Sequence, residues 1–251
     1  MRIVRFEDGG RALYGCVEGE EVRLLDGSPF DRPLPGRVVG PLGAVRLLAP
    51  CEPTKVVAVG LNYKSHALEM GLPLPPEPIL FLKPSTSVIG PLADVVYPAM
   101  AGRVDYEAEL AVVIGRRAKM VAPEDAPAYI LGYTCGNDVT ARDLQKKDGQ
   151  WTRSKGFDTF CPLGPWIVTD LENPNDVNLF CRVNGELRQS GNTSDLVFNA
   201  FELVSFISQI MTLQPGDVVM TGTPAGISPV SRGDTIEVEI EGIGILRNRV
   251  V

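Results

Sequence analysis

Short apolar segments alternate with turn residues over the first 50 residues of the chain. MRIVRF, ALYGCVEG and EVRLL are separated by Gly and Asp, and the proline-punctuated stretch DRPLPGRVVGPLG follows them. Apolar segments of this length, bounded by such residues, are typical of β-strands. The pattern therefore predicts a small all-β domain at residues 1–50.

The pattern changes after residue 50, where apolar strands are interleaved with a few helices. Strands are predicted at residues 56–59, 79–82, 110–114, 166–168, 217–220 and 235–240. We expect a second, larger domain at residues 51–251 that is mixed but dominated by strands. The predicted class of the whole chain is α+β, mostly β.

The clearest helix signal lies in LVFNAFELVSFISQIM, residues 196–211. Ser194 and Asp195 precede it and are the N-caps that this pattern suggests. A helix with one apolar face is expected to pack on a sheet. The apolar residues at helical spacing are Leu196, Ala200, Leu203, Val204, Ile207 and Met211.

Composition narrows the classes of partner. The formal charge is -7 and the sequence pI is about 4.9, so the chain would repel a phosphate backbone, and we expect no nucleic-acid partner. The N-terminus lacks the apolar segment of a signal peptide, and no apolar run approaches the ~18 residues of a membrane span. We therefore expect a cytoplasmic protein that does not bind membranes.

The cysteines indicate neither a disulfide framework nor a structural zinc site. There are five, an odd number, and none forms a C-x-x-C pair. We expect ordinary buried thiols at Cys16, Cys51, Cys135, Cys161 and Cys181.

The segment VDYEAELAVVIG, residues 104–115, places three acids at alternate positions. On a strand, Asp105, Glu107 and Glu109 would share one face, which could simply be solvated. However, the LAVVI that follows is apolar on both faces, as in a strand that is covered on both sides. Carboxylates entering such a region repel one another and lose hydration unless a cation compensates. The pattern therefore favours a hard divalent metal such as magnesium or calcium.

A third acidic ligand is expected from another segment. Asp138 in YTCGNDVTARD follows a predicted strand at a Gly-Asn turn, where a side chain can reach over a sheet edge. The alternative is that Asp138 caps a short helix formed by VTARDLQKK.

His66, in LNYKSHALEMG, is the only histidine of the sequence. If residues 63–70 are helical, Glu69 is its neighbour on one face of the helix. A carboxylate beside an imidazole fixes the tautomer and favours the imidazolium, as a general acid or base requires. The alternative is an exposed pair without catalytic function.

Several motifs together resemble the fumarylacetoacetate hydrolase family, from about Lys55 to the end of the chain. They are NYKSHALEMG, PILFLKPSTSVIG, DYEAELAVVIG, GYTCGNDVTARDLQ, RSKGFDTFCPLGP and LQPGDVVMTGTPAGISPV. The resemblance implies a fumarylacetoacetate hydrolase-like mixed β-roll core, a small N-terminal β domain before it and a homodimer.

The resemblance also implies a metal site and a catalytic pair. Glu107, Glu109 and Asp138 would ligate Mg2+, with Mn2+ or Ca2+ as substitutes. His66 and Glu69 would be the catalytic pair, on a segment that orders over the ligand like a lid.

Further site residues follow from the same resemblance. Lys155 in RSKGFD would be catalytic and would stabilise negative charge, while Arg142 and Gln145 in ARDLQ would bind the distal end of the substrate. Thr223 in TGTPAG would lie near the substrate carboxylate. The alternatives are that Lys155 and Arg142 are surface cations and that Thr223 is only a turn residue. Lys83 in FLKPS would contact residues of the site without contacting the substrate itself.

The implied activity is a divalent-metal-dependent reaction of a small-molecule 2-oxo acid or its enol (dienol). In length and order of motifs, the chain most resembles the family members that act as 2-hydroxyhepta-2,4-diene-1,7-dioate isomerase or as its paired decarboxylase. These enzymes act in aromatic catabolism. Acylpyruvate hydrolase and oxaloacetate decarboxylase are the alternatives from the same residues. A non-enzymatic alternative is a binding protein in which the metal only staples the fold.

Overall fold

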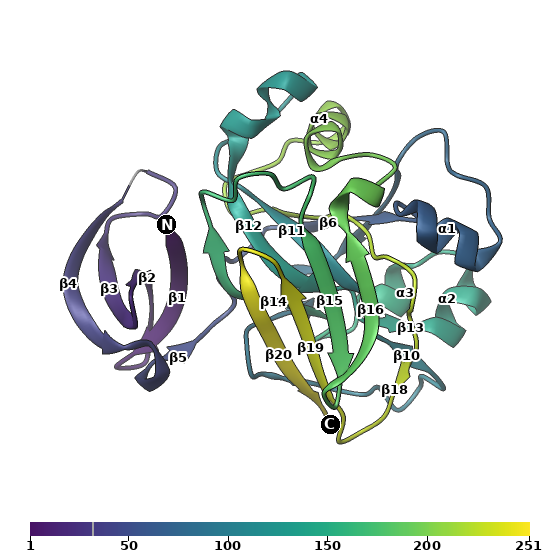
Figure 1. Cartoon of the computed structure of the whole chain (residues 1–251), viewed down its shortest axis with the longest axis horizontal. Helices are drawn as coiled ribbons and strands as arrows, with labels where there is room; N and C mark the ends of the chain where they lie inside the picture. The colour runs from purple at the N-terminus through teal and green to yellow at the C-terminus, as the bar shows by residue number, and fades with distance from the viewer. Residues whose placement is uncertain (32) are drawn as a thin grey trace.

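The computed structural model describes residues 1–31 and 33–251, and Arg32 of the proline-punctuated stretch lies outside them. The described residues form three sheets and a few short helices (Figure 1). Among the described residues, no helix combines the length and apolarity that crossing a bilayer requires. The predicted α+β, mostly β class is confirmed.

The largest sheet runs through most of the molecule. Its strand order is β4 (Leu34–Pro41), β3 (Glu21–Asp26), β2 (Arg11–Glu18), β1 (Arg2–Asp8), β14 (Cys161–Val168), β12 (Ile130–Asn137), β11 (Ala108–Ile114), β17 (Val218–Met220), β6 (Val56–Gly60) and β7 (Ile79–Lys83). Two short strands join it at the side: β5 (Arg46–Leu47) pairs with β1, and β8 (Val88–Ile89) pairs with β14. Most neighbours are antiparallel, but β17 and β6 are parallel.

Two smaller sheets complete the described strands. One has five strands, in the order β16 (Glu186–Asn192), β15 (Asn178–Val183), β19 (Thr235–Ile240), β20 (Gly244–Val250) and β9 (Asp94–Val95). The other consists of β13 (Thr140–Ala141), β10 (Val104–Asp105) and β18 (Pro229–Val230).

The helices are short. The α-helices are α1 (Lys64–Met70), α2 (Arg142–Asp148), α3 (Thr152–Lys155) and α4 (Ala200–Ile210). The 3-10 helices are η1 (Leu42–Ala44), η2 (Ser85–Ser87), η3 (Pro123–Tyr129) and η4 (Thr193–Asp195).

Strand β11 lies at the centre of the hydrophobic core, and all of its residues are buried. Leu110 and Val112 face the core cluster that also contains β15 and β19, whereas Ala111 and Val113 face a second cluster formed with β6 and β14. This confirms the prediction that the LAVVI segment is covered on both sides. The acids at its start therefore lie at the edge of a dry interior.

The first 50 residues have a small core of their own, formed by Val4, Phe6, Val17 and Val22. Figure 1 shows β1 to β4 curling together beside the rest of the molecule. Strand β1 nevertheless pairs with β14, where Arg2 lies opposite Val168. The large sheet therefore continues from this region into the rest of the chain, and the division into domains at residue 50 stays a prediction.

The predicted start of the 196–211 helix is wrong. Helix α4 begins at Ala200, and its N-cap is Asn199. The side chain of Asn199 accepts hydrogen bonds from the backbone N–H groups of Phe201 and Glu202, at 2.9 and 3.1 Å. Glu202 accepts one in return from the Asn199 N–H at 2.8 Å, which completes a capping box.

Residues before this cap are held extended by a distant segment. The carbonyl of Asn62 accepts from the Val197 N–H at 2.8 Å, and its side-chain oxygen accepts from the Phe198 N–H at 2.9 Å. Ser194 and Asp195 lie in η4 instead, and Leu196 after them has an extended ψ of 140° and pairs with Tyr63 in an isolated antiparallel bridge, so the chain leaves the helical conformation before α4 begins.

The six strands predicted after residue 50 correspond to β6, β7, β11, β14, β17 and β19. The predicted and observed strands differ only in where they begin or end. The five cysteines are buried and free, as expected.

We expect Asn199→Ala to lower the free energy of unfolding by about 1 kcal/mol, because it removes the acceptor for two N–H groups at the start of α4. Chemical denaturation monitored by circular dichroism measures this change. Ser194→Ala is the matched control, because Ser194 is exposed and lies outside α4. Equal losses for the two variants would contradict the assignment of the cap.

Candidate active site

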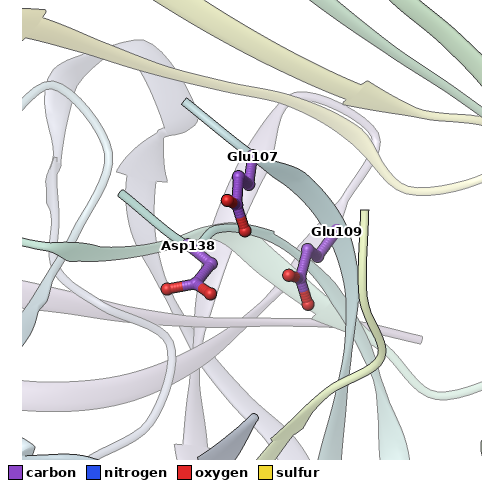
Figure 2. Close-up of side chains that lie close together, drawn as sticks. All are labelled: Glu107, Glu109 and Asp138. Carbon is purple, nitrogen blue, oxygen red and sulfur yellow. The ribbon is translucent and has the colours of Figure 1, made fainter. Parts of the chain in front are cut away.

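Three acidic side chains meet at the ends of two neighbouring strands. Glu109 lies on β11, Glu107 directly precedes this strand, and Asp138 directly follows β12. The strands pair so that Ala108 lies opposite Asn137, which brings Glu107 next to Asp138. One carboxylate oxygen from each acid lies within 4.8 Å of the others, and Figure 2 shows the three groups pointing toward one another. We call these residues the acidic trio.

Asp105 does not join this trio. It lies on β10, which pairs with β13 and β18 rather than continuing into β11. Its carboxylate binds Arg103 at 2.7 Å and Arg142 at 2.9 Å. Arg142 also contacts Glu107, so Asp105 and Glu107 lie near one another as predicted, but Asp105 is paired with arginines and is not part of the trio. The solvated-face alternative is wrong, because Asp105, Glu107 and Glu109 are 0%, 5% and 1% exposed.

Buried cations contact two members of the trio. The Lys155 ammonium lies 2.9 Å from Glu107 and 2.5 Å from Asp138. Lys83, which is fully buried, donates to the other oxygen of Asp138 at 2.5 Å. Arg142 donates to Glu107. Lys155 and Arg142 are thus interior residues, and the surface-cation alternative is wrong for both.

Glu109 is the member of the trio that contacts no cation within residues 1–31 and 33–251. It accepts a hydrogen bond from the Gly222 N–H at 2.7 Å. Burial raises its pKa well above the usual range, and the charges of Asp138 and Glu107 raise it further.

The charges beside Glu107 and Lys155 act in the opposite direction to burial. Burial alone would raise the pKa of Glu107, but Lys155 and Arg142 hold it well below its usual range. Burial alone would lower the pKa of Lys155, but Asp138 and Glu107 raise it. The neighbouring charges therefore favour the ionised form of Glu107 and the protonated form of Lys155, whereas burial and like charges favour the protonated form of Glu109.

The acidic trio fits a hard divalent cation. It offers carboxylate oxygens only, which are the ligands that magnesium, calcium and manganese prefer. A cation there would also compensate the Glu109 carboxylate, which has no cationic partner among the described residues. The alternative function of Asp138 as a helix cap is wrong, because α2 begins after Ala141 and has no side-chain cap.

His66 and Glu69 form the predicted pair on α1. The His66 Nδ1 lies 3.0 Å from a Glu69 carboxylate oxygen, so Nδ1–H donates and Nε2 is left to exchange a proton. The other oxygen of Glu69 accepts from the Gly226 N–H at 3.0 Å. His66 is 8% exposed, so the alternative of an exposed pair is wrong for the histidine, while Glu69 is exposed.

A cavity of about 290 Å³ brings these groups together. All predicted site residues except Glu69 line it, and Glu69 reaches the site through its contact with His66. The lining comprises the predicted residues His66, Glu107, Glu109, Asp138, Arg142, Gln145, Lys155 and Thr223, and in addition Val59, Gly60, Leu61, Met70, Leu72, Ile79, Phe81, Lys146 and Trp151.

The loop at residues 221–226 contacts both the acidic trio and the His66–Glu69 pair. The sequence did not predict this connection. The Gly222 N–H of the loop binds Glu109, and its Gly226 N–H binds Glu69. Thr223 is buried, and its hydroxyl oxygen accepts from Gln189 at 2.8 Å, so it is more than a turn residue. The TGTPAG motif marked this loop, but no pattern indicated what its backbone contacts.

An aromatic wall of the cavity was also missed. The Trp151 and Phe81 rings meet edge to face with centroids 5.2 Å apart, and the Lys155 ammonium lies 5.1 Å from the Phe81 centroid. A Cβ at Gly60 would lie 2.4 Å from the Trp151 ring, so the ring requires glycine there. Nothing in the sequence placed Trp151 beside Gly60.

Comparison with known proteins identifies the class of protein. Residues 55–251 match the family described as fumarylacetoacetate (FAA) hydrolase C-terminal, and residues 1–50 match the family described as Rv2993c-like, N-terminal. The chain belongs to the fumarylacetoacetate hydrolase family, as the motifs predicted. Members of this family are enzymes and generally use a divalent metal.

Three relatives illustrate the range of the family. The chain is 47% identical to 2-hydroxyhepta-2,4-diene-1,7-dioate isomerase from Mycobacterium marinum, with a TM-score of 0.93 over 100% of this chain and 98% of that one. It is 46% identical to human mitochondrial oxaloacetate tautomerase FAHD2A over 84% of this chain and 71% of the relative. Maleylpyruvate hydrolase from Sphingobium sp. SYK-6, in complex with manganese (II) ion and pyruvate, is 34% identical with a TM-score of 0.83 over 100% of this chain and 99% of that one.

We expect the affinity for magnesium or manganese to rise with pH, because Glu109 must lose its proton before its carboxylate can hold a cation. Calorimetric titration of the metal in two buffers of different ionisation enthalpy counts the protons that are released.

Glu109→Gln should abolish the proton release and weaken metal binding by at least about tenfold. Glu124→Gln, at an exposed acid of η3, is the matched control. An affinity that is independent of pH would contradict the assignment of Glu109 as a ligand.

Proposed function

We propose that this protein is a divalent-metal-dependent isomerase of 2-oxo acids and their enols, with 2-hydroxyhepta-2,4-diene-1,7-dioate or a close analogue as substrate. The observation that carries the proposal is that a proton-transfer pair, His66 with Glu69, opens onto the same cavity as the acidic trio. The 47% identity to an isomerase of this name supports the choice of reaction.

Glu107, Glu109 and Asp138 would hold the metal, which we propose to be Mg2+, with Mn2+ or Ca2+ as substitutes. When bound, a divalent cation polarises the 2-oxygen of the substrate and stabilises the enolate form. The manganese and pyruvate in the related maleylpyruvate hydrolase support this proposal. Lys155 and Arg142 hold the pKa of Glu107 below its usual range for this purpose, and Lys83 and Lys155 form ion pairs with Asp138.

His66 would move the proton. Glu69 accepts the Nδ1–H and also stabilises the imidazolium, so Nε2 can take a proton from the enol hydroxyl and deliver one to a carbon of the same ligand. The Gly226 N–H holds Glu69 in place, which limits rotation of the pair.

Gln145 and Thr223 each retain a donor for the substrate. The Gln145 carbonyl oxygen accepts from Arg142 at 2.7 Å, which leaves its amide N–H groups to donate. The Thr223 oxygen accepts from Gln189, which leaves its hydroxyl proton for a substrate carboxylate. Lys155 would stabilise negative charge that develops on the ligand.

Arg142 is less available for binding the substrate than the sequence implied. Its guanidinium already donates to Asp105, Glu107 and Gln145, which uses three of its five N–H groups and fixes its orientation. We therefore propose that Arg142 chiefly positions Glu107 and Gln145.

Oxaloacetate tautomerisation is the second candidate, because the chain is 46% identical to an oxaloacetate tautomerase. It needs the same proton transfer between an oxygen and a carbon. Values of kcat/KM for the dienol and for oxaloacetate, with decarboxylation and acylpyruvate hydrolysis followed in parallel, decide between these activities.

We expect His66→Gln to lower kcat for the isomerisation by about 10²- to 10⁴-fold while metal affinity stays within about twofold, because His66 moves the proton and does not ligate the metal. Ultraviolet absorbance of the dienol measures the rate, and chelator should abolish it. If His66→Gln turns over the substrate at the wild-type rate, His66 does not move the proton. If the wild type itself turns over none of the 2-oxo acids tested, the protein is better explained as a binding protein in which the metal only stabilises the fold.

The homodimer and the cytoplasmic location stay predictions. Light scattering after gel filtration should give about twice the 27.1 kDa mass of one chain. A single-chain mass at micromolar concentration would contradict the dimer.

A further inference from the structure

We propose that Lys146 binds a second, distal carboxylate of the ligand, so that the cavity prefers 2-oxo dicarboxylates to monocarboxylates of the same length. This inference rests on the proposed function, because it assumes that the 2-oxo acid group lies at the acidic trio.

Lys146 differs from the other cations that line the cavity. Arg142 is bound to Asp105 and Glu107, and Lys155 is bound to Glu107 and Asp138. In the part of the chain that the structure describes, Lys146 has no acidic partner within ion-pair distance, and it is exposed. Among the described residues, it is therefore the lining cation whose charge is not already paired with a carboxylate of the protein.

The position of Lys146 on α2 directs it to the cavity. Arg142, Gln145 and Lys146 are separated by three and four positions, so they share one face of the helix, and all three line the cavity. Lys147, the next residue of the same helix, does not line it. The two lysines therefore differ mainly in whether they face the ligand.

The remaining lining suits a ligand with polar ends and a hydrocarbon middle. Ile79, Phe81 and Trp151, together with Met70 and Leu72, offer apolar contacts and no charge. A carbon chain gains from contact with such side chains, whereas a polar group in the middle of the ligand would lose hydration without compensation. A second charged group therefore fits best at Lys146.

Lys146 could have a purely structural function, because a cation in the last turn of a helix is stabilised by the helix dipole. Lys147 lies in the same last turn. A comparison of the two lysines therefore separates ligand recognition from this effect.

The test uses two ligands that differ only in the distal group, 2-oxoheptanedioate and 2-oxoheptanoate. Their dissociation constants are measured by calorimetry with the full chain in excess Mg2+. We expect the wild type to bind the dicarboxylate about twofold to fivefold more tightly, which is the upper part of the range for one solvent-exposed ion pair. Lys146→Met should remove this preference, and Lys147→Met should retain it. The preference should also shrink as sodium chloride is raised from 50 to about 500 mM.

Three outcomes would overturn the inference. If the wild type binds both ligands equally, or if Lys146→Met keeps the preference, Lys146 does not recognise a distal carboxylate, while the proposed function stands because both ligands bind. If neither ligand binds in the presence of Mg2+, the proposed function fails, and this inference fails with it.

Discussion

The structure depends on holding three carboxylates within 4.8 Å of one another in a dry interior. Like charges at this distance repel one another, and each loses hydration, so the arrangement persists only where cations or donors compensate. The chain supplies Lys83 at the end of β7, Lys155 at the end of α3 and the Gly222 N–H from the 221–226 loop. Compensation is uneven: Glu107 and Asp138 are paired, while Glu109 has only a backbone donor. This imbalance supports the proposal that the trio holds a further cation and is not only a structural salt-bridge network.

The topology explains how these groups meet. The antiparallel pairing of β11 with β12 places Glu107 beside Asp138, and the 221–226 loop follows β17, the other neighbour of β11. The backbone of this loop binds both Glu109 and Glu69. The acidic trio and the His66–Glu69 pair are therefore positioned by the same loop. A displacement of the loop would therefore affect both halves of the site. The reactive groups are consequently held by the central sheet, although His66 itself lies on a short helix.

Family membership and the geometry of the site constrain the function to different degrees. The relatives include an isomerase, a tautomerase and a hydrolase, so membership alone defines an enzyme of small molecules and leaves the reaction open. The paired histidine favours reactions that move a proton. The surroundings of the trio, an apolar and aromatic wall with Lys146 beside it, then favour particular ligands. In the function proposed for this chain, the metal ligands and the residues that contact the rest of the substrate thus lie in different parts of one cavity.

The sequence alone determined the mostly β class, the two-sided burial of β11, the helix that carries His66 and the membership of the acidic trio, because each depends on local periodicity or on short motifs. It did not show that Arg142 is held by Asp105, that Lys83 contacts Asp138, or that Trp151 packs on Gly60. It also misplaced the start of α4, which Asn62 decides from 136 residues away. Such contacts join segments that are remote along the chain, so only the tertiary structure could decide which donors, charges and rings meet.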